Sequence, residues 1–492
     1  MSANYNGFLD ANGGVLDVII AVRGQPVALP QPTVAMAEVI LLDCSGSMSM
    51  PPTKLIAART AAAAAINVLR DGTLFAVIAG THIARQVYPP VPGLAVADHH
   101  TRTSATRALR RLVAGGGTAI GRWLLAARSV FTTRPDAIAH AILLTDGRNQ
   151  TESIDQLDAA IKASAGRFTV DCRAIGNARG SHDWSGTELL RIAEPLGANR
   201  VVPVEDLDSL ADDFTTMLGV AMNRVVGNVQ LRIRSTVLAR PGHVKQVYPV
   251  IADLPVQATA VDEGTVDYPI GAWGAEHRDY HLTLDVDPMP PGERRIAWLS
   301  LIAPGGDSGA QITPEVPIAV TWTHEPPLYT GINETVAHYT RQHELATAIR
   351  DGCQALEDGR VDEAARLLGT AVRLAHHAGD HAKLAELQRI VQIEDAAAGR
   401  VRLIADQDFR LWQGAIATST HTRTPAPDRG GKDSATDQPP PDDRPPRRYA
   451  ERCPKCGRLR RGRVCEANHH EYDPDDPDDP DGDAAGDTPH EA

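Results

Sequence analysis

A polar loop between a buried strand and a long helix constrains this chain more than any other stretch. Residues 39–42 read Val-Ile-Leu-Leu, an apolar and partly β-branched run that is typical of a strand buried on both faces. The loop 43–49 follows, and then come prolines at 51 and 52, which the first turn of a helix tolerates, and an Ala-rich helical run over 53–70. The pattern predicts a strand–loop–helix unit of an open parallel sheet, where ligands bind at the carboxyl ends of the strands.

The loop carries oxygen ligands at every second position. Asp43, Ser45 and Ser47 alternate with other residues, so their side chains can point to one place if the loop is extended. Carboxylate and hydroxyl oxygens suit Mg²⁺, Mn²⁺ or Ca²⁺ rather than zinc. The loop supplies only one charge, so we expect a cation here to take further ligands from elsewhere in the chain.

Two later stretches offer such ligands. Residues 114–118 read Ala-Gly-Gly-Gly-Thr and lead into a helical run over 119–131, with Thr118 at the expected N-cap position. Another apolar strand pattern, over 139–145, ends at Asp146 and a turn glycine. Both stretches resemble the first loop, because each places a polar side chain at the end of a predicted strand or at the start of a predicted helix.

These motifs, in this order, resemble the von Willebrand factor type A domain and its metal-ion-dependent adhesion site. That site is written Asp-x-Ser-x-Ser, then a distant Thr, then a distant Asp, and the matching residues are Asp43, Ser45, Ser47, Thr118 and Asp146. The resemblance implies that the three hydroxyls coordinate the metal directly or nearly so, and the two aspartates partly through water. It also implies a sixth coordination position that is open to an acidic group of a partner.

Other interpretations of the first loop fit less well. An aspartyl phosphatase requires a second carboxylate two residues after the first, where Ser45 stands. The surroundings of Ser45 and Ser47 do not form a Gly-x-Ser-x-Gly elbow, and the glycines before Thr118 lack the Lys-Ser/Thr ending of a P-loop. We expect Cys44 to be a small buried residue rather than a nucleophile.

Residues 37–224 alternate between strand and helix patterns throughout. This alternation predicts an α/β fold with a doubly wound, mostly parallel, Rossmann-like sheet. The resemblance to the type A domain covers this span, which is less than half of the chain. Strands are predicted over 38–42, 74–79, 83–88, 141–145, 168–174 and 200–204, and helices over 53–69, 103–113, 119–131, 154–163, 187–193 and 207–222.

The rest of the chain divides by pattern into further regions. Residues 225–325 show short alternating runs between Pro and Gly turns, which predict an antiparallel β-sandwich, and bacterial type A proteins often carry such a flanking sandwich. Residues 1–36 contain a strand that we expect to belong to it. A helical period over 333–415 predicts a small bundle, and the Pro-, Asp- and Arg-rich stretch 418–447 predicts a disordered linker.

The last region contains a cysteine cluster over 448–470. Cys453-Pro-Lys-Cys456-Gly is typical of a zinc knuckle, and Cys465 with His469 or His470 could complete a tetrahedral structural Zn²⁺ site. The second half is irregular, so a degenerate knuckle with free thiols is the alternative. Residues 471–492 form an Asp-rich tail that we expect to be disordered.

Charge and composition narrow the possible partners and location. The net charge of −13 argues against a nucleic-acid binder. The sequence contains no apolar run long enough for a transmembrane helix and no secretory signal, and its cysteines form no disulfide framework. We therefore expect a cytoplasmic protein without a membrane partner.

The sequence predicts a protein–protein interaction module rather than an enzyme. A divalent cation, Mg²⁺ or else Mn²⁺ or Ca²⁺, would bridge the predicted site to a carboxylate of a protein partner. The sequence shows no convincing general base beside the site, so a metal-dependent hydrolase is the weaker alternative. A third possibility is an accessory subunit of a ring ATPase in a chelatase-like system, since some type A proteins have that role. Oligomeric state is left open.

Overall fold

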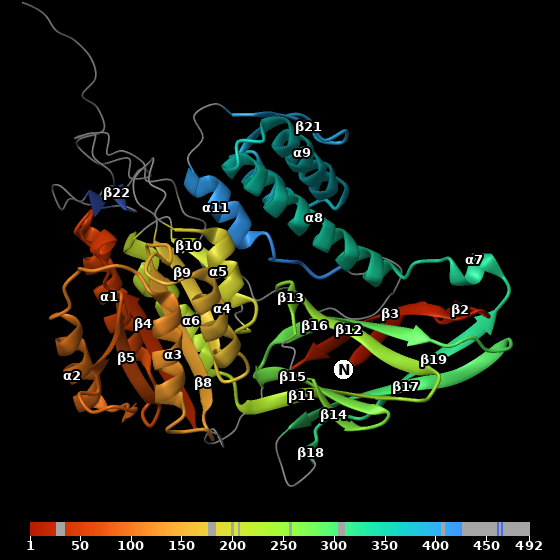
Figure 1. The fold of residues 1–492 in the computed structure, drawn as a ribbon, viewed down its shortest axis with the longest axis horizontal. Coiled ribbons are helices and arrows are strands. Elements are labelled where there is room, and N and C mark those ends of the chain that lie inside the picture. The colour runs from red at the N-terminus through yellow and green to blue at the C-terminus, as the bar shows by residue number, and fades with distance from the viewer. Residues whose placement is uncertain are drawn as a thin grey trace, which may run out of the picture. The chain divides into compact units, whose positions relative to one another are not determined.

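The structure is a computed structural model, and it forms two units, Met1–Pro425 and Ala426–Ala492, which are treated separately (Figure 1). The described residues of the first unit form three large sheets, one two-stranded sheet and several groups of helices. The structure describes residues 1–25, 35–175, 184–197, 201–204, 207–254, 258–303, 310–404, 409–425, 460–461 and 464–465.

A mostly parallel sheet forms the centre of the α/β region. Its strand order is β10-β9-β8-β4-β5-β6, with β6 and the short β7 antiparallel to β5. The chain begins this sheet with β4 in the middle, extends to β6 at one side, and then returns to β8 on the other side of β4. Ligand sites lie where the strand order reverses in this way, which is between β4 and β8. The strands are β4 (Met36–Asp43), β5 (Leu74–Gly80), β6 (Ala84–Tyr88), β7 (Ala95–Val96), β8 (Ile138–Thr145), β9 (Thr169–Ile175) and β10 (Val201–Val204).

Helices cover both faces of this sheet (Figure 1). Alternate residues of β4 explain the two apolar layers, because Val39 and Leu41 face one core while Ile40 and Leu42 face the other. The first core includes α3 (Ile120–Phe131), α4 (Ile154–Ser164) and α5 (Gly186–Ala193), and the second includes α1 (Thr53–Val68), α2 (His99–Leu109) and α6 (Leu210–Met222). The predicted α/β architecture is confirmed at this level.

Helix α2 begins four residues before its predicted start at 103. Asp98 explains the difference, because its carboxylate accepts a hydrogen bond from the Thr101 amide at 2.7 Å while the Thr101 hydroxyl accepts one from the Asp98 amide at 2.8 Å. This reciprocal capping box satisfies two amides that the first turn would otherwise leave unbonded. The predicted start at 103 did not take the pairing of Asp98 with Thr101 into account and is therefore too late.

Two further sheets share one apolar core. The first has the order β1-β3-β16-β12-β13 and the second β14-β15-β11-β17-β19-β2, with β18 paired to β17. The strand β3 from the N-terminal region pairs antiparallel with β16 over its whole length. Buried residues of β3, β16, β11 and β17 meet in the common core. The strands are β1 (Ser2–Tyr5), β2 (Phe8–Asp10), β3 (Gly14–Arg23), β11 (Val226–Ser235), β12 (Ala239–Tyr248), β13 (Ala252–Asp253), β14 (Thr259–Asp262), β15 (Thr265–Trp273), β16 (His277–Val286), β17 (Gly292–Ala303), β18 (Ala310–Gln311) and β19 (Val316–Thr323).

The region after β19 is mainly helical, but it is not the purely helical bundle that the pattern over 333–415 predicts. Residues 391–403 form an antiparallel hairpin of β20 and β21, with Gly399 at φ +68° in its turn. Alternating Val391 and Ile393 favour the extended backbone, and glycine adopts this turn conformation without strain. The elements are α7 (Pro326–Tyr329), α8 (Glu334–Glu357), α9 (Val361–His377), α10 (His381–Leu387), β20 (Val391–Asp395), β21 (Arg400–Leu403) and α11 (Phe409–Thr418).

Residues 418–425, the first part of the predicted linker over 418–447, lie within the described residues. Ser419 and Thr420 are buried, and the Thr422 hydroxyl donates a hydrogen bond to the Val247 carbonyl at 2.6 Å. These contacts attach the chain to β12 as far as the residues that follow α11. The remainder of the predicted linker lies outside the described residues.

In the second unit, the structure describes only the backbone of two short strands. They are β22 (Arg460–Arg461) and β23 (Val464–Cys465), which pair antiparallel. The predicted zinc ligands Cys453, Cys456 and His469, the alternative His470, and the predicted tail over 471–492 lie outside the described residues, and Cys465 is described only as backbone.

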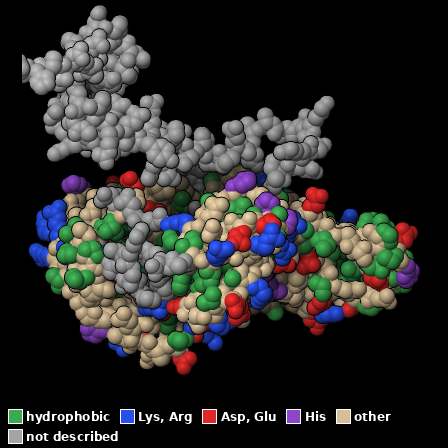
Figure 2. Space-filling model, turned by 90° about the horizontal axis from the view of Figure 1, so that it is seen from above, with side chains coloured by type: hydrophobic (Ala, Val, Ile, Leu, Met, Phe, Trp, Pro, Cys, Tyr) green, Lys and Arg blue, Asp and Glu red, His purple; other side chains and the backbone are tan. Residues whose placement is uncertain are grey.

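On the face seen in Figure 2, basic and acidic side chains are interspersed over the middle of the molecule. Within the part of the chain that the structure describes, none of the helices combines the length and the apolar composition that a membrane span requires.

Candidate metal centre

Three loops meet at the carboxyl ends of β4 and β8. The loop after β4 begins with Asp43 and forms a short 3₁₀ turn over Gly46–Ser49. Backbone hydrogen bonds join it to the glycine loop before α3: the Gly46 amide donates to the Gly116 carbonyl at 2.9 Å, and the Gly115 amide donates to the Cys44 carbonyl at 2.8 Å. Gly116 has φ +80°, a conformation that favours glycine, so the glycine-rich sequence is what allows this close pairing.

The structure brings all five predicted ligand residues to one place. The Ser45 and Ser47 hydroxyls lie 2.9 Å apart, and the Ser47 hydroxyl donates to Asp146 Oδ1 at 2.6 Å. A Cβ atom added to Gly147 would lie 3.2 Å from Thr118 Oγ1, 3.6 Å from Ser47 Oγ and 3.9 Å from Asp43 Oδ2. The point beside Gly147, in the third loop, is therefore surrounded by oxygen atoms of the first and second loops.

Asp43 is held in place by a backbone amide and by the side chain of Thr145, which is not a predicted ligand. The Ser45 amide donates to Asp43 Oδ1 at 2.7 Å, and the Thr145 hydroxyl donates to Asp43 Oδ2 at 2.6 Å. Thr145 also accepts a hydrogen bond from the Gly147 amide at 3.1 Å, so it couples the first and third loops. From the sequence Thr145 was predicted only as the end of a strand, and the available signal was its hydroxyl directly before the predicted ligand Asp146.

Because the site is buried, negative charge that is not compensated there is energetically unfavourable. Asp43 and Asp146 are fully buried, and Ser45 and Thr118 nearly so. Burial, together with the charge of Asp146, raises the pKa of Asp43 to about 6, although hydrogen bonds from Ser45 and Thr145 oppose the shift. Two carboxylates so close together require compensating positive charge nearby.

The surroundings of Cys44 disfavour ionisation of its thiol. Burial, reinforced by the charge of Asp43, raises the pKa of the Cys44 thiol to about 12. The reactive thiolate is therefore scarce at neutral pH, in agreement with the expectation that Cys44 is a small buried residue.

Thr118 does not cap α3 as predicted. The helix begins at Ile120 with Ala119 as its N-cap, and no side chain of the cap residue bonds its amides. The third loop supplies the acceptors instead: Asn149 Oδ1 accepts from the Ile120 amide at 3.1 Å, and the Glu152 carboxylate accepts from the next two amides at 2.8 and 2.9 Å. The Thr118 side chain is thereby not needed for capping and can face the site.

Lys54 is a residue of the site that was not predicted from the sequence. This lysine lies in the first turn of α1, is fully buried, and donates a hydrogen bond through Nζ to Asp146 Oδ2. A signal was present, because Lys54 has the helical spacing of the buried residues Ala58 and Ala61. A lysine at a core position implies a buried partner of opposite charge.

The donor set fits a hard divalent cation. Two carboxylates and three hydroxyls are oxygen donors of the kind that Mg²⁺, Mn²⁺ and Ca²⁺ prefer. Among the described residues, no cluster of three or more His, Cys, Asp or Glu side chains offers a competing centre.

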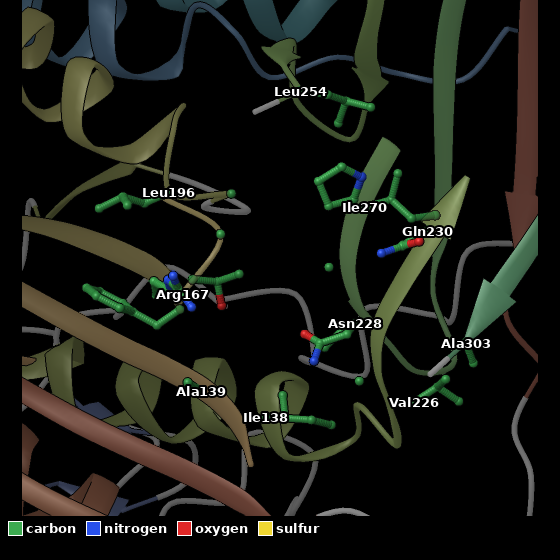
Figure 3. Close-up of a pocket in the computed structure, with 18 of the residues that line it drawn as sticks. Ile138, Ala139, Arg167, Leu196, Val226, Asn228, Gln230, Leu254, Ile270 and Ala303 are labelled. Carbon is green, nitrogen blue, oxygen red and sulfur yellow. The ribbon is translucent and has the colours of Figure 1, made fainter. Parts of the chain in front are cut away.

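A separate cavity of about 1390 Å³ lies at the opposite end of the parallel strands (Figure 3). Ile138 at the start of β8 and Leu196 line one side, and Gln230 of β11 and Ile270 of β15 line the other. None of the five predicted ligand residues lines it. The candidate metal centre is therefore distinct from this cavity.

Comparisons with known proteins agree with this geometry. The family model for the von Willebrand factor type A domain matches residues 39–149, which contain all five candidate ligands. A solved structure described as von Willebrand factor type A from Catenulispora acidiphila is 38% identical in sequence, covers 86% of this chain and 96% of its own, and superposes with a TM-score of 0.79. This chain belongs to the von Willebrand factor type A family.

The similarity to type A proteins extends beyond the α/β region. The crystal structure of the ArnB paralog VWA2 from Sulfolobus acidocaldarius covers 85% of this chain and 96% of its own with a TM-score of 0.54. Its sequence identity is only 11%, so it shows a shared fold alone. A comparison with curated proteins finds no match. The shared fold therefore extends over most of this chain, while the role of the protein has to be argued from the site.

Proposed function

We propose that this type A protein binds a partner protein through a divalent cation and is not an enzyme. The observation that carries the proposal is the point beside Gly147 of the third loop, which oxygens of Asp43 and Ser47 approach from the first loop and the Thr118 hydroxyl from the second. Asp43, Ser45, Ser47, Thr118 and Asp146 would hold the cation. When bound, Mg²⁺ or a similar ion supplies an electrophilic coordination position that a carboxylate can fill.

The chain's own residues prepare this site in two ways. Hydrogen bonds from Ser45 and Thr145 orient Asp43, and the Glu152 carboxylate fixes the start of α3 beside Thr118. Burial excludes water from most of the ligand oxygens, whereas Ser47 stays partly exposed and marks the side from which a partner approaches. A low-dielectric site of this kind strengthens every charge interaction that forms in it.

The same residues support a binding role over hydrolysis. Among the described residues, the carboxylates around the point beside Gly147 are Asp43 and Asp146, both already engaged with hydroxyls of the site. Neither is placed as a base that a water molecule could reach. We place the interaction in a reducing compartment such as the cytoplasm, which the buried free thiols of Cys172 and Cys353 support.

The test is capture of a partner from native lysate in three conditions: with Mg²⁺, with a chelator, and with the double variant Ser45→Ala/Ser47→Ala. A partner retained only by the wild type with Mg²⁺ supports the proposal. Ser49→Ala is the matched control, because Ser49 lies in the same loop but its hydroxyl donates to the Gly46 carbonyl at 2.7 Å. Equal capture in all conditions would rule out recognition through a metal.

A further inference from the structure

A lysine side chain lies among the candidate ligands. Nζ of Lys54 donates to Asp146 Oδ2, and the other oxygen of the same carboxylate accepts from the Ser47 hydroxyl at 2.6 Å. An ammonium group and a ligand hydroxyl thus hold the two oxygens of one candidate ligand. Both Lys54 and Asp146 are fully buried, so this ion pair is shielded from water and salt.

Lys54 lies on the buried side of α1 and not on an exposed surface. Neighbouring positions on the buried side of α1 are Leu55, Ala58 and Ala62. A lysine among them loses its hydration, which is unfavourable unless a close partner of opposite charge compensates. Asp146 is that partner, 92 positions away in the sequence.

The charges of the site explain what Lys54 does. Asp43 and Asp146 contribute two negative charges when ionised, and Lys54 contributes one positive charge. Without a divalent cation, the ion pair leaves a small net negative charge in the buried site. With a divalent cation, the same groups leave a net positive charge, which an anionic partner neutralises. Without Lys54, the loaded site would be neutral and would attract an anion less.

We propose that Lys54 is an internal counter-cation that competes with the divalent cation for Asp146. It holds the first turn of α1 and the third loop together when no metal is bound. It also weakens metal binding through charge repulsion and competition, and it makes the loaded site more attractive to a carboxylate. This inference rests on the proposed function and specifies how the same site is tuned. Lys54 is a positioning and charge-tuning residue, not a ligand.

The decisive variant is Lys54→Gln, which removes the charge but keeps a hydrogen-bond donor for Asp146. Titration calorimetry with Mn²⁺ on the full chain is expected to show a dissociation constant about tenfold lower than in the wild type, equivalent to about 1.4 kcal/mol. A merely structural role would predict weaker binding instead. Lys162→Gln is the control, because Lys162 is exposed near the end of α4, and it should bind Mn²⁺ like the wild type.

The wild-type protein provides a second measurement that does not depend on a variant's folding. The chain contains six lysines, so selective ¹⁵N labelling of lysine gives a simple spectrum of side-chain ammonium groups. Titration with Mg²⁺ should move one signal, that of a buried and hydrogen-bonded ammonium, with the same midpoint as metal binding. Binding of Mg²⁺ that leaves every lysine signal in place would overturn the inference.

The outcomes separate this inference from the proposed function. Equal or weaker Mn²⁺ binding by Lys54→Gln refutes the role of Lys54 and leaves metal-dependent binding intact. Failure of both the wild type and the variant to bind Mn²⁺ at millimolar concentration refutes the metal site itself. Tighter binding by the variant, with unchanged binding by Lys162→Gln, supports both.

Discussion

Replacing His140 should remove a pH-dependent part of the stability of the α/β region. His140 on β8 is buried between two carboxylates: its Nδ1 lies 2.7 Å from Glu38 Oε2 on β4, and its Nε2 lies 3.2 Å from Asp171 Oδ2 on β9. Arg173 and Arg224 are the nearby cations that act on this group of charges. The cluster spans three adjacent parallel strands at the end opposite the candidate metal centre.

The pKa shifts in this cluster give the sign and the size of the effect. Burial alone lowers the pKa of His140, but the charges of Glu38 and Asp171 and their hydrogen bonds outweigh it and raise the pKa from 6.5 to about 9. The charged form is therefore favoured by folding, and its contribution is full below about pH 6.5 and disappears as the pH rises through about 9. The difference corresponds to about 3 kcal/mol at about 1.4 kcal/mol per pKa unit.

Two carboxylates of the cluster set the limits of the pH window. Burial raises the pKa of Asp171, but the hydrogen bond and charge of His140 outweigh it, together with the charges of Arg173 and Arg224, and leave this pKa well below 3.8. The ionised Asp171 therefore stabilises the fold at neutral pH, and this stabilisation is lost only as the pH falls below about 3.8. Burial raises the pKa of Glu38 against the attraction of His140. Between about pH 6.5 and 9, we therefore expect the titration of His140 to dominate the change.

The assay compares the wild type with His140→Gln, which keeps a hydrogen-bond donor but never carries a charge. Pulse proteolysis in urea, read by mass spectrometry of peptides from residues 138–175, gives the free energy of unfolding of this region. We expect the variant to be about 3 kcal/mol less stable at pH 6 and the gap to close by about pH 10. The control is His243→Gln, which breaks an exposed pair with Asp253 and should change stability little at either pH. A gap that is the same at both pH values would refute the reasoning.

Local patterns predicted the parts of the site that depend on neighbours in the sequence. The apolar run before Asp43, the alternation of Asp43, Ser45 and Ser47, and the glycines before Thr118 each encode a strand end or a loop within a few residues. Because parallel strands present their carboxyl ends at one edge, the approach of the loops after β4 and β8 followed from the α/β alternation, whereas the place of Thr118 beside them followed from the resemblance to the type A domain. Membership of the type A family, predicted from these motifs, is confirmed by the comparisons.

The parts that were not predicted depend on pairings distant in the sequence. Lys54 meets Asp146 only because β8 lies beside β4 and brings its carboxyl end next to the first turn of α1, and His140 meets Glu38 only in the register of β4 against β8. Likewise, Glu152 caps α3 from another loop, so the helix does not use Thr118. Periodicity identifies which face of an element is buried, but it does not identify the partner that a charged residue finds there.

Two further substitutions test whether the loops around the site act as the geometry indicates. Gly147→Ala should abolish the stabilisation by Mg²⁺ seen in thermal melts while the metal-free protein stays folded, because the added methyl group would lie 3.2 Å from Thr118 Oγ1 and occupy the space between the ligands without meeting backbone. Gly219→Ala, where the added Cβ meets nothing within 4 Å, is its control, and an undiminished Mg²⁺ shift in Gly147→Ala would show that the cation lies elsewhere. Glu152→Gln should lower the unfolding free energy in urea by about 1 kcal/mol, because a negative charge that accepts two amide hydrogen bonds at the start of α3 is lost. The exposed Glu263→Gln should leave that energy unchanged, and an equal effect of both variants would mean that Glu152 acts through net charge rather than as the cap that holds Thr118 in position.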